Sequence, residues 1–476
     1  MQMILQRTAA PAVRCKGGKE RCIHMNKKIL LWFDVEDYLT PESDDAFMAL
    51  LDMLDESGAR ATIKFCTKKL EQLRERGRTD IIAKLAGHEM SFHTTSHSVH
   101  PLPSEYLDNY GFACGASEFE RRERAGFELL QDLCGQNLTS YGQPGPAWAP
   151  HVFPALRKWG VYTYLDAHEI VGAGGQPFWY GGLLCFTKLN NLSHLVKDGS
   201  SGNMIRQFDA MDTRCADTVF FSIYDHPTEF SSSEFWDEVN FAGGRNPYTF
   251  KPAPLRTAAE RDGLIGQYRD FIAYTAAQPD VEYVTALEAM RLEHQRTRPI
   301  TKADVESYAA SMENIGICGS GAISYAEVGG AYLSASELFN LAARYLTGRM
   351  LIPELLYGPE RFEKSVVTQP RVSARRLAET AFQAAGRVCG YKQLCPVYRV
   401  GDNFLNPVDM MCTMLRAIRT GETEVDIDTQ GRLAAADNVD TGFEWGKWPL
   451  WAPGFKAEGI FEHTKLQCWT LKPAIF

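Results

Sequence analysis

The chain passes from apolar to acidic within one short stretch, Ile29-Leu30-Leu31-Trp32-Phe33-Asp34-Val35-Glu36-Asp37. A short apolar run of this kind is typical of a buried β-strand, which we expect at Ile29–Val35. Because successive side chains of a strand point to opposite faces, Asp34 and Glu36 share one face, and Asp37 takes the other if the strand continues. One of two such carboxylates can bind a metal ion while the other accepts a proton from water. A solvated acidic turn after the strand is the alternative.

Short apolar runs alternate with amphipathic stretches as far as Pro299, a pattern typical of parallel strands joined by crossover helices. The expected strands are Ile29–Val35, Ala61–Cys66, Glu89–Phe92, Val161–Leu165, Val219–Tyr224 and Val281–Val284, and the expected helices are Asp44–Glu56, Ala116–Leu133 and Thr257–Ala277. Gly58 and Gly135 follow two of these helices and suit a left-handed cap. The alternation predicts an α/β fold.

Several expected strands run directly into a carboxylate or a histidine. His93, Asp166 and Asp225-His226 each follow one of them, as Asp34 does in the first. In α/β barrels the carboxyl ends of the strands line one common mouth, so segments far apart in the sequence converge there. The sequence therefore predicts a single site built from these residues.

Two histidines in this set have the spacing of a metal-binding pair. His93 and His97 are four residues apart, which would put both imidazoles on one face of a helical turn. His88 and His100 lie close by, so histidines are concentrated in this segment. The pair alone is a weak signal, and buried histidines without a metal are the alternative.

His226 ends the most apolar of the expected strands. A histidine there can act as a general acid, because its unperturbed pKa of about 6.5 allows both charge states near neutrality. Asp166, at the end of another strand, is placed to orient this imidazole as a carboxylate partner commonly does.

Composition excludes several classes of protein. The 476 residues include 50 Lys and Arg against 59 Asp and Glu, and the net charge of -9 without a long basic run argues against nucleic-acid binding. The longest apolar runs are far shorter than the roughly 20 residues that span a bilayer. Residues 1–28 lack the apolar core of a secretory signal, and the cysteines form no CxxC pair, so we expect a cytoplasmic protein. Met25 is an alternative first residue of the protein. The sequence leaves open whether the protein forms a homo-oligomer.

The character of the chain changes after Pro299, where helical stretches with turn residues between them predominate. A repeat at an offset of 72 residues relates Val328–Arg344 to Val400–Arg416. Each copy contains a helix start, a capping box at Ser334 and an asparagine–proline pair at Asn406. This pattern predicts a small duplicated helical unit, although any two capped amphipathic helices look alike.

We expect three regions in the chain. Residues 1–26 form a disordered tail or reflect a misassigned start, residues 27–298 form the catalytic domain, and residues 299–476 form a smaller, mainly helical domain of unknown function. Aromatic residues are concentrated near the end of the last region. They are expected to form core or, alternatively, a platform on which sugar rings stack.

Three motifs occur in an order and spacing that resemble the polysaccharide deacetylases with NodB homology, the family-four carbohydrate esterases. They are Phe33–Tyr38 with its D-V-E-D acids, Gly87–His97 and Phe221–Phe230. Val281–Arg291 is similar to the closing strand and helix of that domain, and the resemblance covers residues 27–297. It implies a distorted (β/α) barrel.

The resemblance also implies roles for individual residues. It makes Asp34 the catalytic base, His226 the catalytic acid, and His93 and His97 metal ligands. For a third ligand, strand alternation favours Glu36, while Asp37 stays open because the commoner motif has two adjacent aspartates. Two histidines and one carboxylate suit a divalent ion with open positions, zinc first, with cobalt, nickel, iron and manganese as alternatives.

One position departs from the family pattern. Gly142 stands where the family usually has an arginine that steadies the base, so either Gln143 or a residue from elsewhere replaces it, or the chain accepts a different substrate. Loop segments near this position are rich in aromatic residues, whose faces can bind sugar rings. The expected substrate wall consists of Tyr141, Gln143, Pro144, Trp148, Trp179 and Tyr180.

These observations predict a metal-dependent hydrolase that removes an acetyl group from an N-acetylated, or alternatively O-acetylated, sugar or polysaccharide. A cytoplasmic location favours an amino-sugar derivative as the substrate. Two alternatives stay open: hydrolysis of another amide or ureide bond, and an inactive carbohydrate-binding protein, which the missing arginine favours. The joint presence of Asp34, His93, His97 and His226 argues against a binder, because binding alone needs no acid–base pair.

Overall fold

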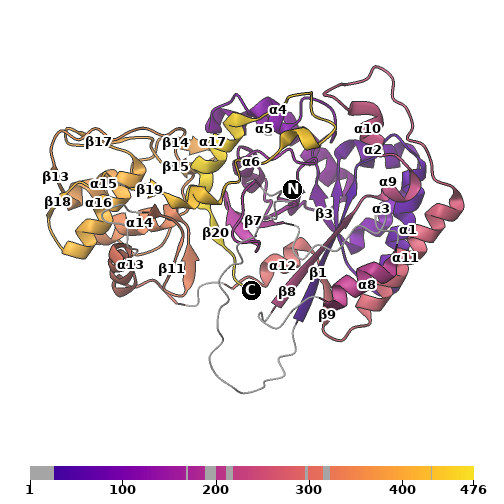
Figure 1. The fold of residues 1–476 in the computed structure, drawn as a ribbon, viewed down its shortest axis with the longest axis horizontal. Coiled ribbons are helices and arrows are strands. Elements are labelled where there is room, and N and C mark those ends of the chain that lie inside the picture. The colour runs from indigo at the N-terminus through magenta and orange to yellow at the C-terminus, as the bar shows by residue number, and fades with distance from the viewer. Residues whose placement is uncertain are drawn as a thin grey trace, which may run out of the picture.

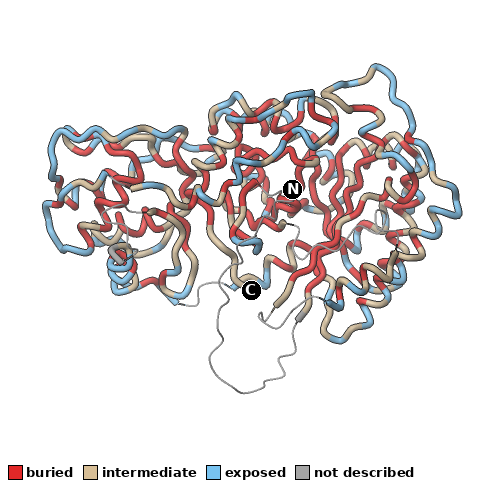
Figure 2. Tube along the Cα trace, in the orientation of Figure 1, coloured by how far each residue is buried: buried red, intermediate tan, exposed pale blue. Residues whose placement is uncertain are grey.

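The computed structural model describes residues 26–167, 170–187, 200–210, 218–294, 298–314, 322–429 and 431–476. These residues form two lobes, on the right and left of Figure 1, and each lobe has a buried interior in Figure 2. Apart from Asn26, the predicted tail at residues 1–26 lies outside the described residues.

The larger lobe is built on a 10-stranded, mostly parallel sheet. Its order is β20-β6-β7-β5-β4-β3-β2-β1-β8. The first half of β1 also pairs with β9, and its second half pairs with β2. The strands are β1 (Asn26–Val35), β2 (Thr62–Phe65), β3 (Glu89–Phe92), β4 (Ser140–Gly142), β5 (Thr163–Leu165), β6 (Phe178–Tyr180), β7 (Leu183–Phe186), β8 (Thr218–Asp225), β9 (Val281–Val284) and β20 (Lys472–Pro473). The six strands expected from the sequence are all present, each within a few residues of its expected bounds.

The side chains of β1 show that the sheet curls. Leu30 and Trp32 pack in one cluster with Leu165 of β5 and with Leu184 and Phe186 of β7. Since β2, β3, β4 and β5 separate β1 from β7 in the sheet, only a curled sheet brings these residues together. The described strands end at β8 and β20 without pairing, so the predicted distorted (β/α) barrel is confirmed in an open form.

The odd-numbered residues of β1, from Ile29 to Val35, pack outward against the helices. The helices of this lobe are α1 (Glu42–Ser57), α2 (Thr67–Glu75), α3 (Thr79–Lys84), η1 (Leu85–Gly87), α4 (Pro103–Leu107), α5 (Phe112–Cys134), α6 (Val152–Lys158), α8 (Ser201–Ala210), α9 (Pro227–Ser231), α10 (Trp236–Phe241), α11 (Ala258–Ala276) and α12 (Ala286–Arg291). As predicted, α1 and α5 end at Gly58 and Gly135, whose φ values of 68° and 67° are left-handed. None of the described helices combines the length and the apolar composition that a membrane span requires.

The smaller lobe has its own core. Its elements are α13 (Lys302–Asn314), β10 (Ala322–Ile323), β11 (Ala326–Val328), β12 (Ala331–Leu333), α14 (Ala335–Leu346), β13 (Arg371–Ser373), α15 (Ala374–Thr380), β14 (Gly386–Val388), β15 (Tyr391–Gln393), β16 (Tyr398–Val400), β17 (Asn403–Leu405), α16 (Pro407–Thr420), β18 (Glu424–Asp426) and β19 (Arg432–Leu433). In each copy of the repeat a β-hairpin leads into a helix, α14 or α16, and the two helices pack together. Ser334 and Asn406 cap these helices with side-chain hydrogen bonds. The hairpins were not anticipated, because their strands are only three residues long.

The end of the chain returns to the larger lobe, as the yellow segment in Figure 1 shows. This segment consists of η2 (Ala434–Asn438), η3 (Trp445–Lys447), α17 (Glu458–Gln467), η4 (Cys468–Thr470) and β20. Trp445, Trp451 and Ile460 join the core of the larger lobe, and β20 extends the barrel sheet beside β6. The sequence placed all of residues 299–476 in one helical domain, whereas the structure packs this last segment on the barrel.

Candidate metal and catalytic centre

Glu36, His93 and His97 meet at the mouth of the barrel, just beyond the ends of β1 and β3. Glu36 Oε2 lies 3.0 Å from His93 Nε2 and 2.8 Å from His97 Nε2. All three side chains are buried. Their potential ligand atoms lie within 4.8 Å of one another, close enough to share one cation.

A loop brings the two imidazoles together, not the helical turn that their spacing suggested. Thr94 and His97 have left-handed backbones, with φ values of 62° and 50°. The backbone N–H of His97 donates to Thr94 Oγ1 at 3.1 Å, which closes the turn. The ring centroids of His93 and His97 are 4.6 Å apart as a result.

The second nitrogen of each histidine is held by a partner. His93 Nδ1 lies 2.8 Å from the carbonyl oxygen of Gly142, to which it donates. His97 Nδ1 lies 2.5 Å from Ser98 Oγ, and this hydroxyl donates to Asp237 Oδ2 at 2.9 Å, so Nδ1 is the donor to Ser98. Partners of this kind fix the ring orientation and leave the Nε2 lone pair for a metal ion.

Glu36 is oriented in a similar way. The indole Nε1 of Trp236 donates to Oε1 of Glu36 at 3.2 Å, so Oε2 is the oxygen that faces the histidines. Two oriented imidazoles and one carboxylate form a donor set that fits zinc or a similar divalent ion with open positions for water and substrate. The residues present therefore fit the predicted metal.

Electrostatics at Glu36 and His93 favour the forms that bind cations. Burial alone would raise the pKa of Glu36, but the two imidazoles beside it, His97 and His93, outweigh burial and hold this pKa well below its usual range. Burial lowers the pKa of His93, and the nearby charge of Lys64 lowers it further. Deprotonated carboxylate and neutral imidazole are the ligand forms, so both shifts support cation binding.

Asp34 joins this cluster from the inner face of β1. Its Oδ2 lies 3.6 Å from His226 Nε2 and 3.8 Å from His93 Nε2, while its Oδ1 lies 2.7 Å from Lys64 Nζ. Glu36 is two residues further along, so the alternation expected from the sequence places both carboxylates at the same mouth.

His226 stands on the opposite side of the cluster, at the end of β8. Its Nδ1 lies 3.1 Å from Glu229 Oε2, one turn further along in α9. Burial opposes its charged form, but the hydrogen bond and charge of Glu229, with the charges of Glu36 and Asp34, raise its pKa to about 10. The sequence assigned the orienting role to Asp166, whereas the structure gives this contact to Glu229. Asp166 lines the same cavity and has a left-handed backbone, with φ of 53°.

A cavity of about 250 Å³ opens over these groups. Its polar floor contains Asp34, Glu36, His97, Asp166 and His226, and its remaining lining includes Glu229, Asp237 and Glu238. The apolar side consists of Gly145, Pro146, Tyr224, Phe235 and Trp448. Trp448 comes from the returning C-terminal segment, so both ends of the chain contribute to one cavity.

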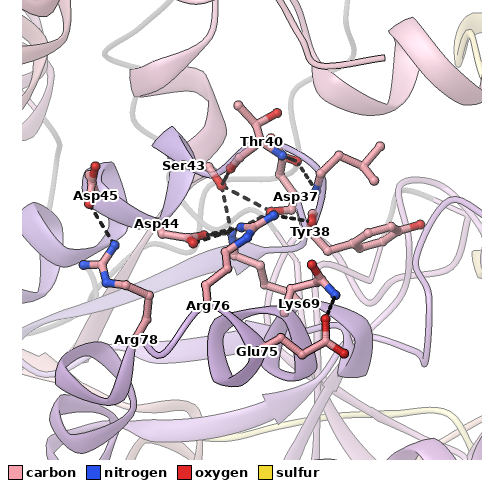
Figure 3. Close-up of polar contacts among 12 residues, drawn as sticks. Asp37, Tyr38, Thr40, Ser43, Asp44, Asp45, Lys69, Glu75, Arg76 and Arg78 are labelled. Atoms are coloured by element: carbon pink, nitrogen blue, oxygen red, sulfur yellow. Dashed lines mark hydrogen bonds and ion pairs between the residues drawn. The ribbon is translucent and has the colours of Figure 1, made fainter. Parts of the chain in front are cut away.

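Asp37, the alternative third ligand, has a different environment. Its Oδ1 accepts hydrogen bonds from the backbone N–H groups of Leu39 and Thr40, and its Oδ2 accepts one from Thr228 Oγ1 at 2.7 Å. Figure 3 shows it in a turn above a network that joins Lys69 to Asp44. These contacts favour Glu36 as the third ligand and give Asp37 a place in the turn that leads into α1.

The six residues of the expected substrate wall do not line the cavity. Tyr141, Gln143, Trp148 and Tyr180 have no exposed surface, Pro144 is buried, and Trp179 lies on another side of the lobe, where its Nε1 donates to Glu293. Gln143 Oε1 accepts from the Tyr164 hydroxyl at 2.6 Å, so it does not reach Asp34 as a substitute for arginine. Aromatic residues bind sugars and fill cores equally well, and here most of the predicted ones are core.

Sequence reasoning missed Lys64, Glu229 and Asp237, and it included Trp448 only among the C-terminal aromatic residues that form core or, alternatively, a platform for sugar rings. Lys64, Glu229, Asp237 and Trp448 all reach it through contacts that depend on the fold. Glu229 alone had a local signal, because it lies three residues after His226 and an α-helix places such residues side by side.

Comparisons with solved structures give low overall similarity. The carbohydrate esterase family-four domain of a multidomain xylanase from the hindgut metagenome of Trinervitermes trinervoides is 12% identical, with a TM-score of 0.32, covering 56% of this chain and 90% of that chain. A peptidoglycan deacetylase from Bacillus subtilis is also 12% identical, with a TM-score of 0.30, covering 56% of this chain and 92% of that chain. A family-four pseudoenzyme from Bacillus anthracis is 9% identical, with a TM-score of 0.31, covering 55% of this chain and 65% of that chain. No family model and no curated protein matches the sequence.

Proposed function

We propose that this chain is a metal-dependent hydrolase that removes an acetyl group from an acetylated amino sugar. The observation that carries the proposal is the convergence of Glu36, His93 and His97 with two further titratable groups, Asp34 and His226, on one cavity. A binding site needs no such acid–base pair, so the arrangement favours an enzyme.

Each residue then has a defined part. Glu36, His93 and His97 would hold one divalent ion, which supplies Lewis-acid polarisation of an acyl oxygen and lowers the pKa of water. Asp34 turns Oδ2 toward the cavity, where a carboxylate can take the proton of an attacking water. His226, charged because of Glu229, stands across from it and can donate a proton to the leaving amine.

The apolar side of the cavity supports a sugar as the substrate. Trp448 packs so close to Gly145 that a Cβ added there would lie 2.5 Å from the indole. Backbone hydrogen bonds from Gly243 and Gly244 to the carbonyl oxygens of Pro449 and Leu450, at 2.9 Å and 2.8 Å, hold this segment beside the cavity. An aromatic face held beside acid and base groups suits the apolar face of a pyranose ring.

The test measures acetate release and bound metal together. Zinc-loaded protein is incubated with the tetramer of N-acetylglucosamine and, separately, with 4-nitrophenyl acetate, which needs no sugar recognition. We expect acetate from both, and about one zinc per chain that His93→Ala removes together with activity. Zinc binding without acetate release from either compound would refute the hydrolase. Release from the ester alone would refute the amino-sugar substrate.

A further inference from the structure

The amine of Lys64 is the least expected group near the centre, because it has no exposed surface. Lys64 lies on β2 directly opposite Asp34 on β1, so both side chains point into the barrel. Burying an unpaired ammonium group costs several kcal/mol. A charge in this position therefore needs a carboxylate, and Asp34 Oδ1 is 2.7 Å away.

Gly142 supplies the space that Lys64 occupies. A Cβ added to Gly142 would lie 2.3 Å from Cδ of Lys64 and 3.0 Å from its Nζ, closer than real Cβ contacts. Any side chain at residue 142 would displace the lysine. The carbonyl oxygen of the same glycine accepts from His93 Nδ1, so its backbone has a second part in the centre.

The ion pair determines which oxygen of Asp34 faces the cavity. With Oδ1 beside Lys64, Oδ2 is turned toward His226 Nε2 and His93 Nε2. The approach of Nζ to Oδ1 falls outside hydrogen-bond angles, so the contact acts as a close charge pair rather than as a directed bond. A misplacement of about 1 Å in a catalytic group can lower a rate about 100-fold.

We infer that Lys64 is the positioning residue for the base in the proposed reaction, and that Gly142 is the residue that admits it. The inference rests on the proposed function. It also accounts for the glycine found where the resemblance led us to expect an arginine: the cation comes from β2, and a side chain at residue 142 would exclude it.

The chain offers a matched control for loss of a buried lysine. Lys69 is 1% exposed and pairs with Asp44 at 2.5 Å, and its Nζ also donates to Ser43 Oγ, as Figure 3 shows. Lys64→Met and Lys69→Met each remove one buried ion pair, but only the first touches Asp34. A purely structural role for Lys64 would make the two variants behave alike.

The experiment measures kcat, KM and zinc content for both variants, with N-acetylglucosamine tetramer and with 4-nitrophenyl acetate. Lys64→Met should keep its zinc and its KM within about twofold while kcat falls about 100-fold on both substrates. Lys69→Met should keep kcat within about twofold while the urea midpoint falls. The double variant Lys64→Ala with Gly142→Arg, which returns a cation from β4, should recover about tenfold in kcat over Lys64→Ala.

Three results would overturn the inference: an unchanged kcat in Lys64→Met, equal loss of kcat in both methionine variants, or no recovery in the double variant. If Lys64→Met does not fold, Gly142→Ala replaces it, because the added Cβ displaces the lysine without removing its charge. Gly142→Ala should show the same loss of kcat with zinc retained, and normal turnover would refute the inference. If the wild type hydrolyses 4-nitrophenyl acetate but not the sugar, the proposed substrate class is refuted. The part of Lys64 is then still tested by kcat of the variants on the ester. An inactive wild type would refute both.

Discussion

Removing the charge of Glu229 should move the alkaline limit of activity to lower pH. Glu229 Oε2 accepts from His226 Nδ1 at 3.1 Å, and its charge helps raise the pKa of His226 to about 10. Glutamine keeps an oxygen that can accept the same hydrogen bond but carries no charge. Glu229→Gln therefore isolates the electrostatic contribution while the ring stays oriented.

The size of the shift follows from the contact. A hydrogen bond to a charged partner contributes about 1.5–3 kcal/mol and a neutral one about 0.5–1.5 kcal/mol, a difference of about 1–1.5 kcal/mol, and one pKa unit corresponds to about 1.4 kcal/mol. Loss of the charge should therefore lower the pKa of His226 by about one unit. The direction of the pH dependence follows from the proposed role of His226. An acid must be protonated to donate, so activity is present below the pKa of His226 and is lost as the pH rises through it.

The assay is kcat against pH with saturating zinc and N-acetylglucosamine tetramer. We expect the alkaline limb of Glu229→Gln to lie about one pH unit below that of the wild type, with little change near neutrality. Glu234→Gln, an exposed glutamate in the following loop, is the control and should leave the limb in place. A limb that does not move in Glu229→Gln, or that moves equally in both variants, would refute His226 as the acid.

Three further predictions test other parts of the site. Trp448→Ala should raise KM for the tetramer about 2- to 12-fold, since an aromatic contact contributes about 0.5–1.5 kcal/mol. It should leave KM for 4-nitrophenyl acetate unchanged. An equal rise of KM in Phe443→Ala would show that Trp448 has no specific contact with the sugar. Glu36→Gln should lose its zinc, as measured by elemental analysis. Asp37→Asn should keep its zinc, while its free energy of unfolding in urea falls by about 1–3 kcal/mol. The reverse pattern would exchange the roles of the two residues. Burial lowers the pKa of His88 to about 4, whereas a histidine of the unfolded chain has a pKa of about 6.5. As the pH falls, the unfolded chain therefore takes up this proton first, and the free energy of unfolding should fall by about 2 kcal/mol from pH 7 to pH 5. His88→Phe should weaken this pH dependence, and an unchanged slope of unfolding free energy against pH would contradict the prediction.

The core of the candidate site was predictable because its signals are local. Asp34, His93 and His226 each stand at the end of a short apolar run, and parallel strands of a barrel bring such ends to one mouth. Alternation along β1 also favoured Glu36 over Asp37 before any contact was known. Two of the barrel helices, α1 and α5, could be placed for the same reason, since their caps at Gly58 and Gly135 are encoded beside them.

The rest of the site depends on contacts between distant residues. Lys64 reads as one charged residue within a strand, and nothing near it in the sequence indicates that β1 places Asp34 opposite it. Trp448 is one of several aromatic residues in its segment, of which Trp445 and Trp451 are core. Whether an aromatic side chain meets solvent, core or substrate is decided by the fold, so composition could not separate them.

The return of the C-terminal segment has a consequence for how this protein is made. The last of the three proposed ligands, His97, precedes Trp448 by 351 residues, the difference of their numbers. At a synthesis rate of about 5–20 residues per second, roughly 20–70 s pass between them. A nascent chain would thus contain the three proposed ligands long before Trp448, which lines the cavity beside them, has been made. Because Trp445, Trp451 and Ile460 also belong to the core of the larger lobe, the barrel that carries the candidate site is complete only after this last segment has been made and has packed.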